Sequence, residues 1–168
     1  QLRVDGIEFD VVGFTNLSHD HLDDYGTMQK YFEAKLELFD PSRSDKAVIS
    51  LDSDYGSQAA ELIKIPKVTI GSHGQPESDY LVSIDEENSM FTAFTLNGPE
   101  GKLTSSVPII GSHMAANAGL AIVMLLQAGF EFERIASAIA GGIRAYLPGR
   151  TERVSGDTGP TVYVDFGH

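Results

Sequence analysis

The sequence predicts an α/β fold in which helices flank a mostly parallel sheet, with a small antiparallel subsheet beside it. Short β-branched runs at residues 47–51 and 67–70 enclose a helical pattern at 56–63, and this strand, helix, strand order is typical of parallel sheets. Three further strand-like stretches lie between residues 80 and 108 and are joined by turn-rich segments, which favours antiparallel pairing. The two patterns together predict a mostly parallel main sheet with a small antiparallel sheet laid beside it.

The first elements follow from changes in the hydrophobic pattern. Residues 7–14 alternate and then become apolar, which predicts a strand that enters a buried sheet. Residues 15–27 are polar and include two His and three Asp, which predicts a loop. Apolar residues then recur at helical spacing from 28 to 39, with Thr27 available as the N-cap and Pro41 after the end of the helix.

The rest of the chain predicts three strands, then two helices, and then two further strands. Ser112 is expected to cap a strongly apolar helix, and the pair Gly141-Gly142 is expected to end the helix that follows. The expected elements are strands near 81–84, 90–96 and 103–107, helices at 112–128 and 132–141, and strands at 151–154 and 161–166.

The composition excludes several classes of protein. The 168 residues are 42% hydrophobic, which fits one domain or a piece of a larger one. Twelve Lys and Arg against 24 Asp and Glu give a net charge of −12, which argues against a general nucleic-acid or membrane-surface binder. The absence of Cys excludes a disulfide framework and a thiolate metal site, and it is compatible with a reducing cytoplasm.

No segment has the pattern of a membrane span or a signal peptide. The longest apolar stretch, residues 118–127, is shorter than the roughly 20 apolar residues that cross a bilayer. The chain opens with Gln1 rather than Met, and it stops directly after the strand expected at 161–166. We therefore expect a fragment of a longer protein.

Lys35 falls on the apolar side of the helix expected at 28–39. A buried ammonium costs several kcal/mol unless it is paired, deprotonated or chemically converted. One interpretation is that Lys35 extends to water or pairs with an Asp of the preceding loop. The other is that its amine, partly neutral because it is desolvated, reacts with carbon dioxide to form a carbamate. The carbamate would be an oxygen ligand for a hard cation such as Mg²⁺. Its apolar neighbours on this side are Met28, Tyr31, Phe32, Leu36 and Phe39.

The polar loop before this helix contains further candidate ligands. Alone, such a loop is explained as a solvated turn with acidic residues that favour the following helix. Together with a carbamylated Lys35, the loop would bring unlike ligands to one cation. The candidates are Asn16, Asp20, His21, Asp23 and Asp24.

Two segments around this loop and helix closely resemble the Mur ligase family. Residues 15–23 are TNLSHDHLD and residues 31–35 are YFEAK, which match the family signature T-N-L-x-x-D-H-L-D followed by Y-x-x-A-K. Three later segments resemble the family motifs G-x-H/F-N-x-x-N, P-G-R-M-E and V-D-Y-A-H, and these are residues 111–117, 148–152 and 164–168. The departures from these motifs are Met114, Thr151 and Phe166-Gly167.

The resemblance covers only part of the family's architecture, so residues 1–168 are expected to be most of the central ATP-binding domain. The family's N-terminal domain for the uridine nucleotide and its C-terminal domain for the incoming amino acid are expected to be absent. The phosphate loop G-x-x-x-x-G-K-[S/T] does not occur either, because the only Gly-Lys pair, Gly101-Lys102, lacks the upstream Gly. We therefore expect the isolated chain neither to hydrolyse ATP nor to ligate.

The resemblance implies an ATP-dependent amide-bond ligase of peptidoglycan biosynthesis in the cytoplasm. It points to the branch that adds the third amino acid to UDP-N-acetylmuramoyl-L-alanyl-D-glutamate through an acyl phosphate, with Mg²⁺ as cofactor. The implied partners are this UDP-N-acetylmuramoyl-dipeptide, ATP and an amino acid, with neither nucleic acid nor a membrane. The sequence does not distinguish meso-diaminopimelate, lysine and ornithine, because the family's specificity motif belongs to the C-terminal domain.

The resemblance also implies roles for individual residues. Lys35 would be carbamylated and would hold Mg²⁺ together with His21. Gln1 and Arg3 would belong to the segment that contacts the muramoyl peptide. The implied ATP-binding residues are Asn16, Asn117, Arg150, Asp165 and His168.

Simpler interpretations of these residues stay open. From the residues alone, Asn117 would be a helix Asn that bonds its own backbone, Arg150 a solvated turn cation and Asp165 a strand-end cap. Two other functions also remain, namely a related ligase such as folylpolyglutamate or cyanophycin synthetase, and a non-catalytic α/β binding domain without a metal.

Two expectations concern the isolated chain. Little carbamate is expected on Lys35, because the metal partners that the family carries upstream would be missing. Self-association is also expected, because a sheet that lacks its first strands exposes an unpaired edge and apolar surface.

Overall fold

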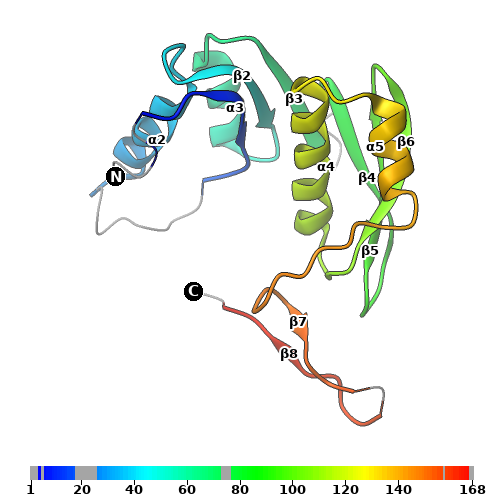
Figure 1. Cartoon of the computed structure of the whole chain (residues 1–168). Helices are drawn as coiled ribbons and strands as arrows, with labels where there is room; N and C mark the ends of the chain where they lie inside the picture. The colour runs from blue at the N-terminus through cyan, green and yellow to red at the C-terminus, as the bar shows by residue number, and fades with distance from the viewer. Residues whose placement is uncertain (1–3, 5, 18–25, 73–76, 157, 167–168) are drawn as a thin grey trace.

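One six-stranded sheet organises the chain, as the computed structural model shows for residues 4, 6–17, 26–72, 77–156 and 158–166 (Figure 1). The strands follow one another across the sheet in chain order, so each strand pairs with its neighbours in the sequence. The pairs from β1 to β4 are parallel, and β5 and β6 continue the sheet in antiparallel pairing. The strands are β1 (Phe9–Phe14), β2 (Ser44–Ser50), β3 (Lys67–Ser72), β4 (Tyr80–Glu87), β5 (Thr92–Gly98) and β6 (Gly101–Val107).

Helices α2 and α3 connect β1 to β2 and β2 to β3, whereas α4 and α5 follow β6, and together the helices cover both faces of the sheet. In Figure 1, α4 lies along the sheet beside β3 and β4, while the first helices lie with β1 and β2. A two-stranded antiparallel hairpin follows the last helix. The bounds are α2 (Met28–Leu36), the 3₁₀ turn η1 (Glu37–Phe39), α3 (Asp54–Leu62), α4 (Ser112–Gln127), α5 (Phe132–Ile139), β7 (Glu152–Arg153) and β8 (Tyr163–Val164).

Alternation along β2 builds two apolar cores, one on each face. Ala47 and Ile49 join the cluster with α2 and α3, whereas Val48 joins the cluster with α4. All three side chains are fully buried. Successive strand residues point to opposite faces, so a strand covered by helices on both sides has to be apolar at consecutive positions. This explains the continuous apolar run that predicted the strand.

Helix α4 approaches the sheet closely because small residues lie at the contact. A Cβ atom at Gly13 of β1 would lie 2.8 Å from the Leu120 side chain, and one at Gly119 of α4 would lie 2.5 Å from Val82. Both glycines therefore let the helix backbone approach to a distance that a larger residue would prevent. This places the first turn of α4 beside the ends of the parallel strands.

Most of the predicted elements are confirmed, with small differences at their ends. Thr27 caps α2 as expected, since its hydroxyl accepts a hydrogen bond from the Lys30 N–H at 3.2 Å. The prediction that Ser112 caps the long helix is wrong. Gly111 holds the N-cap position with φ of 120°, which favours glycine, and Ser112 is the first helical residue. The antiparallel strands extend the main sheet because β4 pairs with both β3 and β5.

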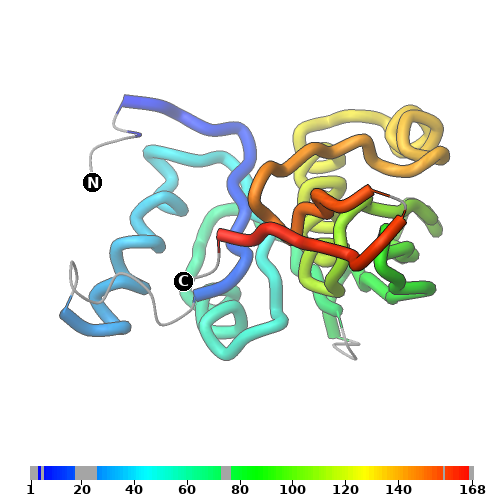
Figure 2. The backbone as a smooth tube through the Cα atoms, turned by 90° about the horizontal axis from the view of Figure 1, so that it is seen from below, coloured from blue at the N-terminus to red at the C-terminus, as the bar shows by residue number. Residues whose placement is uncertain are grey.

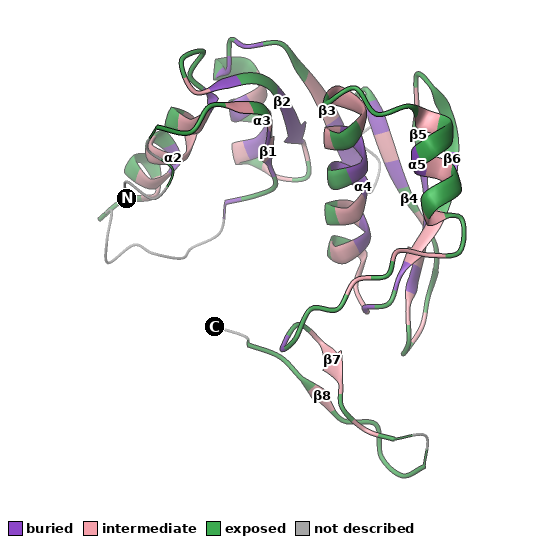
Figure 3. Cartoon of the chain, in the orientation of Figure 1, coloured by how far each residue is buried: buried purple, intermediate pink, exposed green. Residues whose placement is uncertain are grey.

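The β7–β8 hairpin projects from the end of the molecule where the parallel strands terminate (Figure 1). Viewed from below in Figure 2, β8 runs back from the hairpin tip toward the first half of the chain. The residues of β7 and β8 are exposed or half-buried, in contrast to the buried central strands of the main sheet (Figure 3). The Tyr163 hydroxyl ties it to the body by donating to the Ser89 carbonyl at 2.8 Å.

None of the helices in the described part of the chain has both the length and the apolar character needed to cross a bilayer.

Candidate functional site

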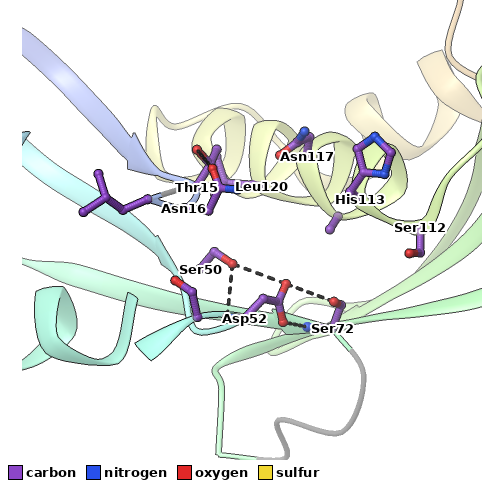
Figure 4. A pocket seen from close by; sticks show the side chains of 12 residues that line it. Thr15, Asn16, Ser50, Asp52, Ser72, Ser112, His113, Asn117 and Leu120 are labelled. Atoms are coloured by element: carbon purple, nitrogen blue, oxygen red, sulfur yellow. Dashed lines mark hydrogen bonds between the residues drawn. The ribbon is translucent and has the colours of Figure 1, made fainter. Parts of the chain in front are cut away.

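A cleft of about 330 Å³ lies where β1, β2 and β3 end, and we call it the strand-end cleft. In open α/β sheets, ligands bind outside the carboxyl ends of parallel strands, because the loops there carry side chains that no core packing uses. Helix α4 forms the opposite wall (Figure 4). The lining residues are Thr15, Asn16, Leu17, Ser50, Asp52, Ser53, Ser72, Ser112, His113, Ala116, Asn117 and Leu120.

Asp52 organises the sheet side of the strand-end cleft (Figure 4). Its carboxylate accepts hydrogen bonds from the Ser72 N–H at 2.6 Å and from the Ser72 hydroxyl at 2.9 Å. The Ser50 hydroxyl lies 3.3 Å from the same carboxylate and also accepts from the Asp52 N–H. Asp52 therefore ties the ends of β2 and β3 together, and both serines are buried.

Two of the predicted ATP-binding residues meet in this cleft. Asn16 follows the end of β1, and Asn117 lies in the second turn of α4. Within the described residues the Asn117 amide has no hydrogen bond, so its simpler interpretation as a backbone-bonded helix residue finds no such bond here. Amide groups beside a helix N-terminus, whose free N–H groups favour anions, suit a nucleotide.

Lys35 lies on α2 and does not line the strand-end cleft. It is half-buried, and its Nζ atom lies 4.9 Å from the centre of the Tyr31 ring. A cation over a ring face is attracted by the ring's electrons, so this contact helps to hold the Lys35 side chain in place. This contact does not decide between the two interpretations of Lys35, and its role as a carbamate stays a prediction.

The predicted metal site extends beyond the residues that the structure describes. His21 and the acidic residues at 20, 23 and 24 lie outside them. Within the described ranges, no group of three or more His, Asp or Glu side chains is placed to hold a metal. A magnesium site made by Lys35 and His21 therefore stays a prediction.

A second cleft, of about 270 Å³, lies between the β7–β8 hairpin and the end of β6, and we call it the hairpin cleft. Arg150 lines it, and the segment 108–110 that forms part of its wall leads directly to Ser112 in the strand-end cleft. The lining residues are Ser89, Met90, Pro108, Ile109, Ile110, Ala145, Tyr146, Leu147, Arg150, Thr151, Glu152, Arg153 and Tyr163.

Asp165 lies directly after β8 and contacts the residue next to Arg150. Its carboxylate accepts hydrogen bonds from the Thr151 N–H at 2.7 Å and from the Thr151 hydroxyl at 3.2 Å. This agrees with the simpler interpretation of Asp165 as a strand-end cap, and among the residues that the structure describes the second carboxylate oxygen accepts no hydrogen bond. The remaining predicted site residues, Gln1, Arg3 and His168, lie outside the described residues.

Asp52 and Ser72 are site residues that the sequence motifs do not indicate. Both follow or end strands that the hydrophobic pattern predicts, at 47–51 and 67–70. Polar residues at the carboxyl ends of two neighbouring parallel strands are a usable signal, because these ends meet at one edge of the sheet.

Comparison with known proteins decides the family of the chain. A family model described as the Mur ligase middle domain matches residues 1–125. The chain belongs to the Mur ligase family. This confirms the resemblance carried by the segments at 15–23 and 31–35.

Named Mur ligases align with almost the whole chain. A UDP-N-acetylmuramyl-tripeptide synthetase of Leifsonia xyli is 53% identical over 99% of this chain. A UDP-N-acetylmuramoyl-L-alanyl-D-glutamate–2,6-diaminopimelate ligase of Streptomyces avermitilis is 38% identical over the same share. The chain spans 33% of the length of each of these relatives.

Solved Mur ligase structures share this fold. A UDP-N-acetylmuramoyl-L-alanyl-D-glutamate–2,6-diaminopimelate ligase superposes with a TM-score of 0.77 at 26% identity, and the match covers 92% of this chain and 32% of that one. A pseudomurein peptide ligase type C from Methanothermus fervidus superposes with a TM-score of 0.76 at 17% identity, covering 94% and 38% respectively, and it supports the fold alone. The α/β Mur ligase fold predicted from the sequence is therefore confirmed.

Proposed function

We propose that this chain is the central part of an ATP-dependent ligase that adds the third amino acid to UDP-N-acetylmuramoyl-L-alanyl-D-glutamate. The observation that carries the proposal is the strand-end cleft, where Asn16 and Asn117 of two separate family motifs lie at the ends of three parallel strands. The names of the two relatives, a tripeptide synthetase and a diaminopimelate ligase, support the choice of substrate.

Within this proposal, the two clefts bind ATP together. Asn16 and Asn117 hold the nucleotide from the strand-end cleft, beside the N–H groups of the first turn of α4. Arg150 contacts the nucleotide from the hairpin cleft, and the Oδ1 atom of Asp165 accepts a hydrogen bond from a ribose hydroxyl. An acidic protein can hold a polyanion in this way because its donors are local and oriented.

The proposed reaction joins a carboxylate and an amine at the expense of ATP. The D-glutamyl carboxylate attacks the γ-phosphorus, ADP leaves, and an acyl phosphate forms. The amine of the incoming amino acid then attacks the acyl carbon, phosphate leaves, and the amine gives up a proton as the amide forms. Positioning and charge neutralisation dominate this chemistry, because two polyanions have to meet.

Magnesium is the proposed cofactor, and it would neutralise the phosphate charge when bound. Lys35, as a carbamate, and His21 are the residues of this chain proposed to hold it. Lys35 fits this role in being half-buried, and a carbamate on it would have to move away from the Tyr31 ring, whose face attracts cations. The chain's own contribution is a side chain that changes charge when the metal is present.

The remaining parts of the ligase are proposed to lie in the rest of the polypeptide. The relatives are about three times as long as this chain, since it spans 33% of each. We propose that the uridine-nucleotide domain, the phosphate loop and the amino-acid domain belong to that remainder, that Gln1 and Arg3 contact the muramoyl peptide, that His168 lies beside the ribose, and that the protein works in the cytoplasm.

The test uses the full-length protein that carries this chain. Purified protein is incubated with UDP-N-acetylmuramoyl-L-alanyl-D-glutamate, ATP, Mg²⁺ and, in parallel, meso-diaminopimelate, lysine or ornithine. Release of ADP together with a tripeptide product of the expected mass supports the proposal. The variants Asn16→Ala and Asn117→Ala are expected to raise the KM for ATP about tenfold, because each removes a polar contact worth about 1.4 kcal/mol.

Asn97→Ala is the matched control, because Asn97 is exposed on β5 and does not line the strand-end cleft. It should leave the KM for ATP unchanged. ATP turnover with a folate or a peptide polymer, and none with the muramoyl dipeptide, would replace the proposal with another amide ligase. ATP turnover with none of these acceptors would contradict it.

A further inference from the structure

The turn that carries Arg150, residues 146–151, is held by a carboxylate on each side. The Glu152 carboxylate accepts hydrogen bonds from the Gly149 N–H at 2.8 Å and from the Tyr146 hydroxyl at 2.9 Å. On the other side, Asp165 accepts both bonds that Thr151 donates. The residues directly before and after Arg150 are therefore anchored independently.

The backbone of the turn is also packed tightly. The Phe166 N–H donates to the Gly149 carbonyl at 2.7 Å, and a Cβ atom at Gly149 would lie 2.1 Å from the Phe166 ring. Gly149 is buried and has φ of 67°, a backbone conformation that favours glycine. The turn thus has one conformation that its neighbours enforce.

Neither carboxylate pairs with the arginine between them. Within the described residues, the Arg150 guanidinium has no hydrogen bond or ion pair, and the side chain is exposed in the hairpin cleft. Where an Arg and a carboxylate do pair, they often form two parallel hydrogen bonds. Here both carboxylate oxygens of Glu152 accept hydrogen bonds from neutral donors, and the bond from Tyr146 raises the pKa of the Tyr146 hydroxyl. The arrangement leaves the guanidinium available to an anion.

We propose that Glu152 is a positioning residue for the nucleotide site, which holds the Arg150 turn so that the guanidinium is presented to the phosphates of ATP. The inference rests on the proposed function of Arg150 as an ATP contact. Glu152 acts through the backbone of Gly149 and the hydroxyl of Tyr146, and it does not touch the nucleotide itself.

The experiment is a double-mutant cycle in the full-length protein that carries this chain. Glu152→Ala is expected to raise the KM for ATP and the Kd for MgADP about tenfold, while the KM for the UDP-muramoyl substrate stays unchanged. In an Arg150→Ala background, Glu152→Ala should have no further effect on either constant, because it acts through the arginine. Glu152→Gln keeps one acceptor for the Gly149 N–H and should retain affinity within about threefold.

A merely structural role would give a different result. Glu152→Ala would then lower the active fraction, and hence kcat, without a change in the KM for ATP. Equal effects in the wild-type and Arg150→Ala backgrounds would also overturn the proposal. Glu133→Ala, which removes an exposed carboxylate from the first turn of α5, is the control for loss of charge.

The two proposals fail in distinguishable ways. Ligase turnover by the wild type with no effect of Glu152→Ala on ATP binding would overturn the positioning role alone. Wild-type protein that binds MgADP but forms no amide product would contradict the proposed ligase, and the cycle on MgADP affinity would still decide the role of Glu152. Wild-type protein that binds no nucleotide would overturn both.

Discussion

At the scale of single residues, the contact between Lys35 and Tyr31 bears on the proposed carbamate. The ammonium lies 4.9 Å from the centre of the Tyr31 ring, an attraction that a carbamate would not share. A carbamate on Lys35 is expected to be stable only when a cation binds it, since its negative charge would otherwise be half-buried without a partner. The charge of this side chain is therefore expected to follow the presence of the metal.

Removal of the Lys35 amine should abolish ligase turnover in the full-length protein. Lys35→Ala is expected to lower kcat on the order of 100-fold or more, because it deletes a proposed metal ligand. A short carboxylic acid added to the assay should restore part of the activity by occupying the vacated place. Lys30→Ala, on the exposed side of the same helix, is the control. Full activity in Lys35→Ala would exclude the carbamate role.

Tyr80 is a second residue whose protonation is linked to the fold. Its ring is buried and its hydroxyl donates to Glu100 at 2.8 Å. Burial first, and then the bond to and charge of Glu100, raise the pKa of Tyr80 to about 12. Because the neutral phenol is favoured in the folded state, its contribution to stability is complete below pH 10 and is lost as the pH rises from 10 to 12.

Substitution of Tyr80 tests this linkage. Tyr80→Phe is expected to lower the free energy of unfolding by about 1 kcal/mol at neutral pH, through loss of one hydrogen bond. It should also flatten the decline in stability between pH 10 and 12. Denaturant unfolding at several pH values measures both effects. An unchanged decline in Tyr80→Phe would mean that another group causes it.

At the scale of elements, β2 is the strand on which the other elements depend. Its residues 47–50 are buried on both faces, and α3 returns so closely that a Cβ atom at Gly56 would lie 1.9 Å from the Ser50 carbonyl. The same turn contains Ser53, whose hydroxyl caps α3 by accepting the Gly56 N–H at 3.1 Å. The tight return after β2 thus positions Asp52 in the strand-end cleft.

A methyl group at Gly56 should disrupt this return. Gly56→Ala is expected to destabilise the fold by about 3 kcal/mol, because the clash is with backbone and cannot be relieved by a rotamer change. Gly141→Ala is the matched control, since a Cβ atom there meets nothing within 4 Å. Thermal unfolding of the two variants gives the comparison. Equal melting temperatures would show that α3 can shift without cost.

At the scale of the whole molecule, the net charge and the exposed apolar surface have opposite effects on self-association. The net charge of −12 keeps molecules apart, whereas apolar side chains exposed around the hairpin favour contact. Among the described strands, only β2 pairs with β1, so the other edge of β1 is open. Exposed apolar residues in the region of the hairpin include Met90, Tyr146, Val154 and Phe166.

The 168-residue chain by itself is expected neither to hydrolyse ATP nor to ligate, and it is expected to self-associate. Its sequence lacks a phosphate loop, so no ADP should be released from ATP, with or without the muramoyl dipeptide. Light scattering at increasing concentration and salt should show masses above that of a monomer, because salt screens the repulsion. Measurable ligation, or a clean monomer at high concentration in high salt, would contradict the respective expectation.

Local pattern was sufficient for most elements because each has its own signal. The alternation at β1, the cap at Thr27 and the apolar run of α4 are properties of neighbouring residues. The N-cap of α4 was missed because a glycine with positive φ can take this position without a side-chain bond, and Ser112 beside it is the commoner choice. The single continuous sheet was also missed, because the sequence pattern does not show that β3 pairs with β4 and so joins the parallel and antiparallel strands.

By itself, the sequence determined the family, the order of helices and strands, and the identity of residues such as Asn16, Asn117 and Arg150. Only the tertiary structure decided that Asn16 and Asn117 share one cleft with Asp52, and that Asp165 holds the turn of Arg150 through Thr151. The physical reason is that propensity and periodicity act between neighbours in the chain, whereas a binding site is made where strand ends, a helix terminus and a hairpin converge from distant parts of it.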